Sequence, residues 1–200
     1  NWILKNINLE IKKGSKVGIK GITGSGKSTL GNIIIGLLDP TKGQLFVDDI
    51  LINSQNKVAW QKNISIIPQN IFLNDVSIAE NIAIGVNPKE INLEKVKNVA
   101  KQAQIHDFIE STPNQYNEKV GERGIRLSGG QLQRIGIARA LYREAKVILF
   151  DEATNQLDTN TESLIMQSIN NLDKETTILF IAHRLSTLEN CDQIIDFEKL

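Results

Sequence analysis

The stretch Gly21-Ile22-Thr23-Gly24-Ser25-Gly26-Lys27-Ser28-Thr29 fits the phosphate-binding pattern G-x-x-x-x-G-K-[ST] at every specified position. Its glycines let the backbone turn without a Cβ atom, so successive N–H groups can point at phosphate oxygens. Lys27 adds a mobile positive charge, and the hydroxyl of Ser28 is placed to ligate Mg²⁺. The stretch therefore predicts a site for a nucleoside triphosphate and a magnesium ion.

The residues on either side of this stretch predict a strand and a helix. The apolar segment Val17-Gly18-Ile19 leads directly into the loop, and helical periodicity continues over residues 27–38. Such a helix directs the positive end of its dipole at a bound anion. Gly31 lies inside it, where glycine is unfavourable by about 1 kcal/mol relative to alanine, so we expect close backbone packing there. A glycine- and serine-rich turn that only caps a helix is the alternative, and it leaves Lys27-Ser28-Thr29 unexplained.

The overall composition narrows the class of partner. The chain has 200 residues with 40% hydrophobic content, which suggests one domain, with room for a subdomain. Lys plus Arg and Asp plus Glu both number 23, and no polybasic run occurs. This balance argues against a nucleic-acid surface and against direct lipid binding by this segment. The single cysteine, Cys191, cannot form an internal disulfide, which fits a reducing compartment and an ordinary packing role.

The apolar segments of the chain are short. The longest, residues 33–38 and 178–182, fall far below the roughly 20 residues that a membrane-spanning helix needs. The chain opens without methionine at Asn1 and stops at Leu200 without a turn or tail, so we expect a domain of a longer protein, truncated at both ends.

Strand-like and helix-like segments alternate along the chain, which predicts the α/β class with a mostly parallel sheet. Ligands of such sheets collect at the carboxyl ends of the strands. Residues from about 77 to 142 carry helical spacing with polar interruptions, and we interpret them as a helical subdomain inserted into the domain 1–200. Further strands are expected at 45–47, 64–67, 147–150 and 177–181, and a helix at 161–172.

Two acids follow a buried strand. Asp151 and Glu152 come directly after the apolar run 147–150, where carboxylates are costly unless a cation or ligand is present. One carboxylate near Mg²⁺ and a second beside the attacking water is a suitable division for phosphoryl transfer. We therefore assign Asp151 to the metal and Glu152 to the general base. Two exposed acids that cap the next helix are the alternative.

A second helix start lies at Leu127-Ser128-Gly129-Gly130-Gln131, which precedes a strongly helical run from Leu132 to Tyr142. Bare amides at a helix N-terminus form an anion site. From spacing alone, simple capping by Ser128 explains the pattern equally well.

The order of these motifs resembles the nucleotide-binding domain of ATP-binding cassette (ABC) transporters over nearly the whole chain. The phosphate loop, Gln69, the LSGGQ motif at 127–131, the acids 151–152 and His183 occur in the family's order. LSGGQ is the most specific of them, because a phosphate loop alone fits many NTPases.

The resemblance implies that two copies of the domain contribute different residues to each ATP site. Two copies face head to tail, and ATP lies between the phosphate loop of one and the LSGGQ helix of the other. Gln69 senses Mg²⁺ and the attacking water, His183 contacts the γ-phosphate and orients Glu152, and Asp158 lies at the dimer seam. The residues expected to touch the γ-phosphate in the partner's site are Ser128, Gly129, Gly130 and Gln131.

Two segments resemble exporter-type members. Residues 75–85 and 120–124 match the stretches that lie beneath the coupling helices of the membrane domain. The resemblance implies the ATP-hydrolysing domain of an exporter, with the transmembrane domain fused upstream of Asn1. It implies a location at the cytoplasmic face of a membrane, the cell membrane in a bacterium. Intact catalytic residues are compatible with two equivalent sites and a homodimer, and a heterodimer stays open. The substrate is chosen by membrane helices outside this sequence.

Two other functions would require different features of the sequence. A soluble ABC ATPase that acts on nucleic acid or ribosomes would be expected to carry long coiled-coil insertions, a second cassette or a basic face. A silent ATP-binding module would be expected to lack part of the set Lys27, Asp151, Glu152 and His183, all of which are present.

The chain also departs from the family pattern. The adenine-stacking aromatic residue is expected before Asn1, and Trp2 is placed too late to substitute for it. Asn155-Gln156 replaces the commoner Ser-Ala, and Lys119 stands where exporters usually have an acid. The change at 119 affects the expected route of transmission to the membrane domain.

Overall fold

The computed structural model describes residues 2–121, 124, 127–154, 157–182, 188–189 and 191–197. It divides into two compact units. The first, which we call the sheet unit, comprises residues 1–66, 145–152 and 173–200. The second, the helical unit, comprises residues 67–144 and 153–172. Each is described by itself below.

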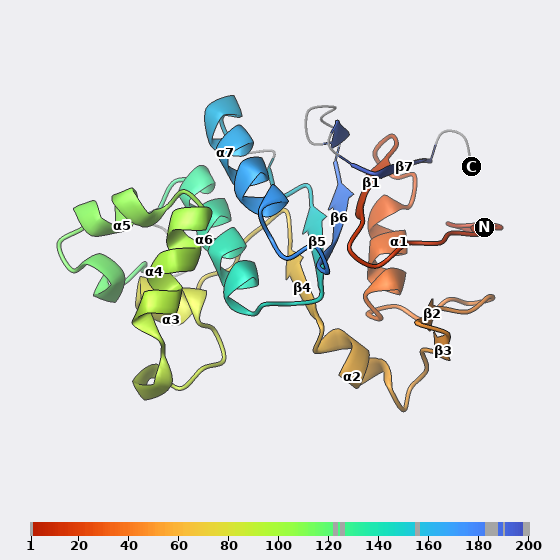
Figure 1. Ribbon diagram of the computed structural model, residues 1–200, viewed down its shortest axis with the longest axis horizontal. Helices are drawn as coiled ribbons and strands as arrows, with labels where there is room; N and C mark the ends of the chain where they lie inside the picture. The colour runs from red at the N-terminus through yellow and green to blue at the C-terminus, as the bar shows by residue number, and fades with distance from the viewer. Residues whose placement is uncertain are drawn as a thin grey trace. The chain divides into compact units, whose positions relative to one another are not determined.

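A five-stranded sheet with the order β4-β5-β6-β1-β7 forms the core (Figure 1). The pairs β5–β6, β6–β1 and β1–β7 are all parallel. The central strands are apolar because they are buried: all five residues of β6 and the first four of β5 are nearly inaccessible to solvent. The expected parallel sheet is confirmed. The strands span Lys16–Lys20 (β1), Ile64–Ile67 (β4), Val147–Asp151 (β5), Thr177–Ile181 (β6) and Gln193–Asp196 (β7).

Helix α1, Lys27–Ile34, follows the phosphate loop and packs on the sheet. A Cβ atom added to Gly31 would lie 2.9 Å from Ile181 Cδ1 and 3.3 Å from Leu149 Cδ2. The close packing expected at Gly31 is therefore confirmed. The expected continuation of the helix to residue 38 is wrong, because Gly36 adopts a φ of 71° and ends it.

A small antiparallel hairpin and helix α2 complete the described elements of the sheet unit. Strands β2, Phe46–Val47, and β3, Ile50–Leu51, are joined by Asp48 and Asp49, which both have positive φ, as the two central residues of a type I′ turn require. The hairpin supplies the antiparallel β region expected beside the parallel sheet.

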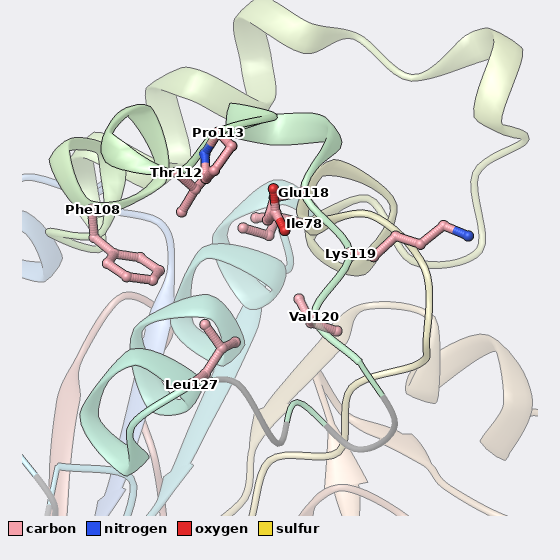
Figure 2. Close-up of a pocket in the computed structure, with 8 residues that line it drawn as sticks. All are labelled: Ile78, Phe108, Thr112, Pro113, Glu118, Lys119, Val120 and Leu127. Carbon is pink, nitrogen blue, oxygen red and sulfur yellow. The ribbon is translucent and has the colours of Figure 1, made fainter.

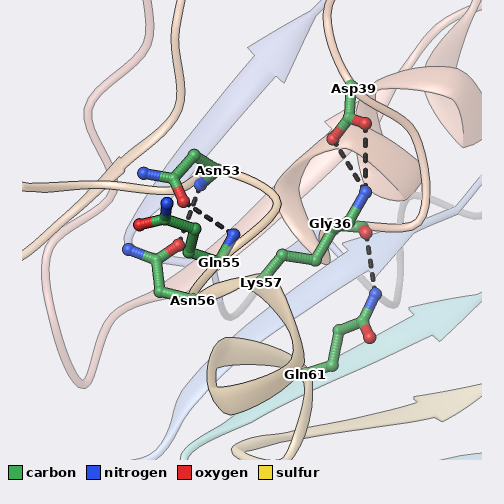
Figure 3. Close-up of polar contacts among 7 residues, drawn as sticks. All are labelled: Gly36, Asp39, Asn53, Gln55, Asn56, Lys57 and Gln61. Atoms are coloured by element: carbon green, nitrogen blue, oxygen red, sulfur yellow. Dashed lines mark hydrogen bonds and ion pairs between the residues drawn. The ribbon is translucent and has the colours of Figure 1, made fainter.

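Helix α2, Lys57–Gln61, is tied to the segment that follows α1. Figure 3 shows Lys57 Nζ beside the Asp39 carboxylate, at 3.0 and 3.1 Å from its two oxygens, and Gln61 Nε2 donating to Gly36 O at 2.7 Å. The adjacent turn is held by Asn53, whose side chain accepts from Gln55 N. The bond from Gln61 satisfies a carbonyl left open where α1 ends.

The helical unit contains short helices with defined starts. Ser77 and Ser128 each form a capping box, with Glu80 and Gln131 respectively, which satisfies orphan N–H groups at the starts of α3 and α6. Within the described residues, no helix has the length and apolarity needed to cross a bilayer. The elements are α3 Ile78–Ile82, η1 Pro88–Glu90, α4 Leu93–Gln102, α5 His106–Ser111, η2 Gln115–Asn117, α6 Gly129–Tyr142 and α7 Thr159–Asn170.

Substituting Gly31 tests the packing of α1. Gly31→Val would press a branched side chain into Ile181 and Leu149, and we expect it to lower the free energy of unfolding by about 1–3 kcal/mol. Urea denaturation measures the change. Ser163→Val, at an exposed position inside α7, is the matched control and should alter stability by only a few tenths of a kcal/mol, roughly the helix propensity difference. Equal effects of the two changes would contradict the packing argument.

The only cysteine of the sequence gives a second test. Burial, and secondarily Asp192, raises the pKa of the Cys191 thiol from 9.0 to about 11. Its thiolate fraction at about pH 8 is then smaller by about 100-fold than that of an unperturbed thiol. Alkylation by iodoacetamide should be slower by that order in the native protein than in urea, and similar rates would show that the thiol is not buried as described.

Candidate nucleotide-binding site

The loop between β1 and α1 depends on glycine for its shape. Gly24 and Gly26 have φ values of 82° and 100°, which favour glycine. A Cβ atom on Gly26 would also lie 2.7 Å from Leu4 Cδ2. Residues 22–24 at the tip are exposed. The loop therefore offers backbone groups to solvent from a conformation that side chains at its glycine positions would disrupt.

Lys27 lies inside this loop. Its side chain is buried, and its ammonium donates to Gly21 O and Ile22 O at 2.8 Å each. These carbonyls supply hydrogen bonds but no negative charge. The loop thus holds a buried cation that an anionic ligand would stabilise.

Ser28 and Asp151, two of the three residues expected to ligate a metal, lie close together. Ser28 Oγ donates to Asp151 Oδ1 at 3.5 Å, although one residue lies in the first turn of α1 and the other ends β5. Burial raises the pKa of the Asp151 carboxyl, and the Glu152 carboxylate raises it further, against smaller opposing effects of Ser28 and Lys27. A carboxylate in this environment is stabilised by a cation, and hydroxyl and carboxylate oxygens are ligands that Mg²⁺ prefers. The donor set fits the metal.

Glu152 leaves the sheet in an unusual backbone conformation. Its φ is 51°, which is rare for a residue other than glycine. Its N–H donates to Ile181 O at 2.9 Å, continuing the ladder between β5 and β6 by one residue. Lys27, Ser28, Asp151 and Glu152 all belong to the sheet unit.

The LSGGQ motif, residues 127–131, lies at the start of helix α6 in the helical unit. Ser128 N donates to Gln131 Oε1 at 2.8 Å, and Gln131 N donates to Ser128 Oγ at 3.3 Å. The capping alternative therefore describes these two side chains. Gly129 and Gly130 are the first residues of the helix, where N–H groups lack intrahelical acceptors, so an external anion can use them.

The remaining expected site residues fall in different places. Gln69 is exposed after β4 and belongs to the helical unit. Asp158 is the N-cap of α7, where hydrogen bonds from the side chain and backbone of Thr161 lower its pKa. The sequence reasoning missed this capping role, although an aspartate followed by the helical run from 161 signals it. His183, Asn155 and Gln156 lie outside the described residues.

A separate pocket opens in the helical unit, with an empty volume of about 410 Å³ that includes open solvent (Figure 2). Lys119 pairs with Ser77 through an isolated bridge beside it. The pocket does not include the residues expected to bind phosphate. It is lined by Ile78, Phe108, Thr112, Pro113, Glu118, Lys119, Val120 and Leu127.

A phosphate loop after β1, two acids at the end of β5 and a parallel sheet define a P-loop nucleotide-binding fold. The sequence model of the family described as ABC transporter matches residues 4–155. The chain belongs to the ABC transporter family, as an ATP-binding ATPase domain of the exporter type. The predicted fold, ATP binding and ATPase class are confirmed.

Individual relatives support this assignment. The chain is 46% identical over 199 residues to the alpha-hemolysin translocation ATP-binding protein HlyB of Escherichia coli, covering 98% of this chain and 28% of that protein. It is 40% identical over 193 residues to the ATP-dependent lipid A-core flippase of Pseudoalteromonas translucida, covering 96% and 33%. A solved bacterial Atm1-family ABC exporter with ATP bound has a TM-score of 0.90 and 38% identity, covering 97% and 34%. The chain thus spans about a third or less of each.

Replacing Glu152 separates its backbone strain from its chemistry. We expect Glu152→Gly to be more stable than Glu152→Ala by about 0.5–1 kcal/mol, because only alanine keeps a Cβ atom in the left-handed region. Both changes remove the carboxylate, so the comparison cancels its repulsion of Asp151. Chemical denaturation of the two variants provides the measurement, and an alanine variant as stable as the glycine variant would contradict the strain.

Proposed function

We propose that this domain drives an exporter, using ATP binding and hydrolysis to move substrate or lipid across a membrane. The observation that carries the proposal is the contact between Ser28 and Asp151 beside the buried ammonium of Lys27, with Glu152 next in the chain. These residues provide phosphate binding, metal ligation and a base within one unit. The names of the relatives, a translocation ATP-binding protein and a flippase, support the coupling to transport.

Each residue has a proposed role in hydrolysis. The loop 21–29 and Lys27 bind the phosphates of ATP, while Ser28, Asp151 and Gln69 hold Mg²⁺. When bound, Mg²⁺ neutralises phosphate charge and aligns the γ-phosphate. Glu152 accepts the proton of the attacking water, and His183 orients Glu152 and contacts the γ-phosphate.

A second copy completes the site in this proposal. The exposed tip of the loop at 22–24 leaves one side of the triphosphate open. Residues 128–131 of a head-to-tail partner close it with the amides that begin α6. The proposed partners are a second nucleotide-binding domain, as a homodimer, and a transmembrane domain fused upstream of Asn1.

The location and organisation follow from this arrangement. We place the domain at the cytoplasmic face of a membrane, the cell membrane in a bacterium. Residues from about 77 to 142 act as the helical subdomain that contacts the membrane domain. Closure of two copies around ATP, and separation after hydrolysis, would alternate the membrane helices between two states.

Glu152→Gln tests the enzymatic assignment. Because glutamine cannot accept the proton, we expect kcat for ATP hydrolysis to fall at least about 100-fold while ATP binding persists. Phosphate release measures turnover, and ATP retained after rapid desalting measures the closed state. Glu90→Gln, at an exposed position in η1, is the control and should keep full turnover.

Two outcomes would contradict the proposal. Undiminished turnover in Glu152→Gln would remove the base from its role. Turnover that depends on added nucleic acid or ribosomes, and not on the membrane-bound protein, would favour a soluble ABC ATPase instead.

A further inference from the structure

Arg139, in the C-terminal half of α6, binds two separate points of another segment. Its Nε donates to Asn81 O at 2.9 Å, its Nη1 to Phe72 O at 3.0 Å and its Nη2 to Asn81 Oδ1 at 3.3 Å. The segment begins shortly after Gln69 and ends in α3. One guanidinium therefore hydrogen-bonds both ends of the segment 72–81 to helix α6.

Asn81 organises the other side of this contact. Its side chain is fully buried, and it donates to Asn74 O at 3.0 Å and Ser77 O at 3.1 Å while accepting from Asn74 N at 3.0 Å. These bonds close the loop that precedes α3 upon itself. Arg139 thus binds a loop that is already held by its own hydrogen bonds. A displacement of Arg139 would therefore move the whole segment.

Close packing extends the contact along α6. A Cβ atom on Gly136 would lie 2.4 Å from Ile71 Cδ1, so only glycine lets Ile71 approach this closely. Leu73 is buried, and both Leu73 and Leu132 lie against Gly124. Residues 71–73 are therefore fixed to the helix by shape as well as by hydrogen bonds.

The charge of Arg139 is not explained by ion pairing. No carboxylate among the described residues pairs with it, and burial lowers its pKa. A partly buried cation held only by neutral oxygens is costly, whereas the planar fork of arginine reaches several acceptors at fixed angles. Lysine keeps the charge but cannot reproduce that geometry. The arrangement favours a positional role.

We propose that Arg139 is a positioning residue that locks the segment following Gln69 to α6, so that Gln69 and the motif Ser128–Gln131 move as one piece. Arg139 lies roughly 15 Å along the helix from Gly129, at a rise of about 1.5 Å per residue. A contact this far from the start of α6 fixes the orientation of the helix axis, and with it the orientation of the amides at the N-terminus. This inference rests on the proposed function, in which those amides close the partner's ATP site.

The test uses Arg139→Lys in the complete protein, with Arg143→Lys as the matched control. Arg143 is exposed at the end of the same helix. In the Glu152→Gln background, we expect Arg139→Lys to raise the ATP concentration for half-maximal retention roughly tenfold. Binding of trinitrophenyl-ATP to the open site should not change, because the phosphate loop is untouched. In the background with Glu152 intact, kcat should fall without a change in KM.

The outcomes separate this inference from the proposed function. If Glu152→Gln alone retains ATP and adding Arg139→Lys changes nothing, the role of Arg139 is overturned while the proposed function stands. If Glu152→Gln alone retains no ATP, the proposed function fails and the inference falls with it. A loss equal to that of Arg143→Lys also overturns it. Should Arg139→Lys fail to fold in a thermal melt, Asn81→Ala replaces it, with a smaller shift expected in the same direction.

Discussion

The register of three parallel strands determines where the chemistry of this domain lies. Ile181 at the end of β6 pairs with Ile19 of β1 on one side and with Asp151 of β5 on the other. The phosphate loop and the two acids therefore leave the sheet at the same edge, although they are far apart in the sequence. A shift of this register would separate Ser28 from Asp151, and the close fit of Gly31 on Ile181 and Leu149 opposes such a shift.

The candidate nucleotide-binding site contains partly desolvated charges and one strained backbone conformation. Lys27 is held by carbonyls, Asp151 is partly desolvated beside another acid, and Glu152 has a left-handed backbone. Each of these features is unfavourable in isolation, and each is compatible with phosphate and a divalent cation as ligands. The stable core of β1, β5 and β6 allows them to persist together.

The helical unit uses the same residues for structure and for the proposed recognition. Ser128 and Gln131 cap α6 through their side chains, which leaves the glycine amides between them for an external acceptor. The contacts of Arg139 and the packing at Gly136 hold the segment after Gln69 against the helix. Local capping thus shapes the motif, while long-range contacts orient the helix that presents it.

Features formed by residues that are contiguous in the chain could be predicted from the amino-acid sequence alone. They are the phosphate loop, the apolar strands, the acids after residues 147–150 and the close packing at Gly31. These follow from local periodicity and from residue types that few other conformations tolerate. The contact of Ser28 with Asp151, and the hydrogen bonds from Arg139 to the carbonyls of Phe72 and Asn81, are visible only in the folded chain. Such contacts join backbone groups and side chains distant in sequence, and a carbonyl carries no residue-specific signal from which its partner could be predicted.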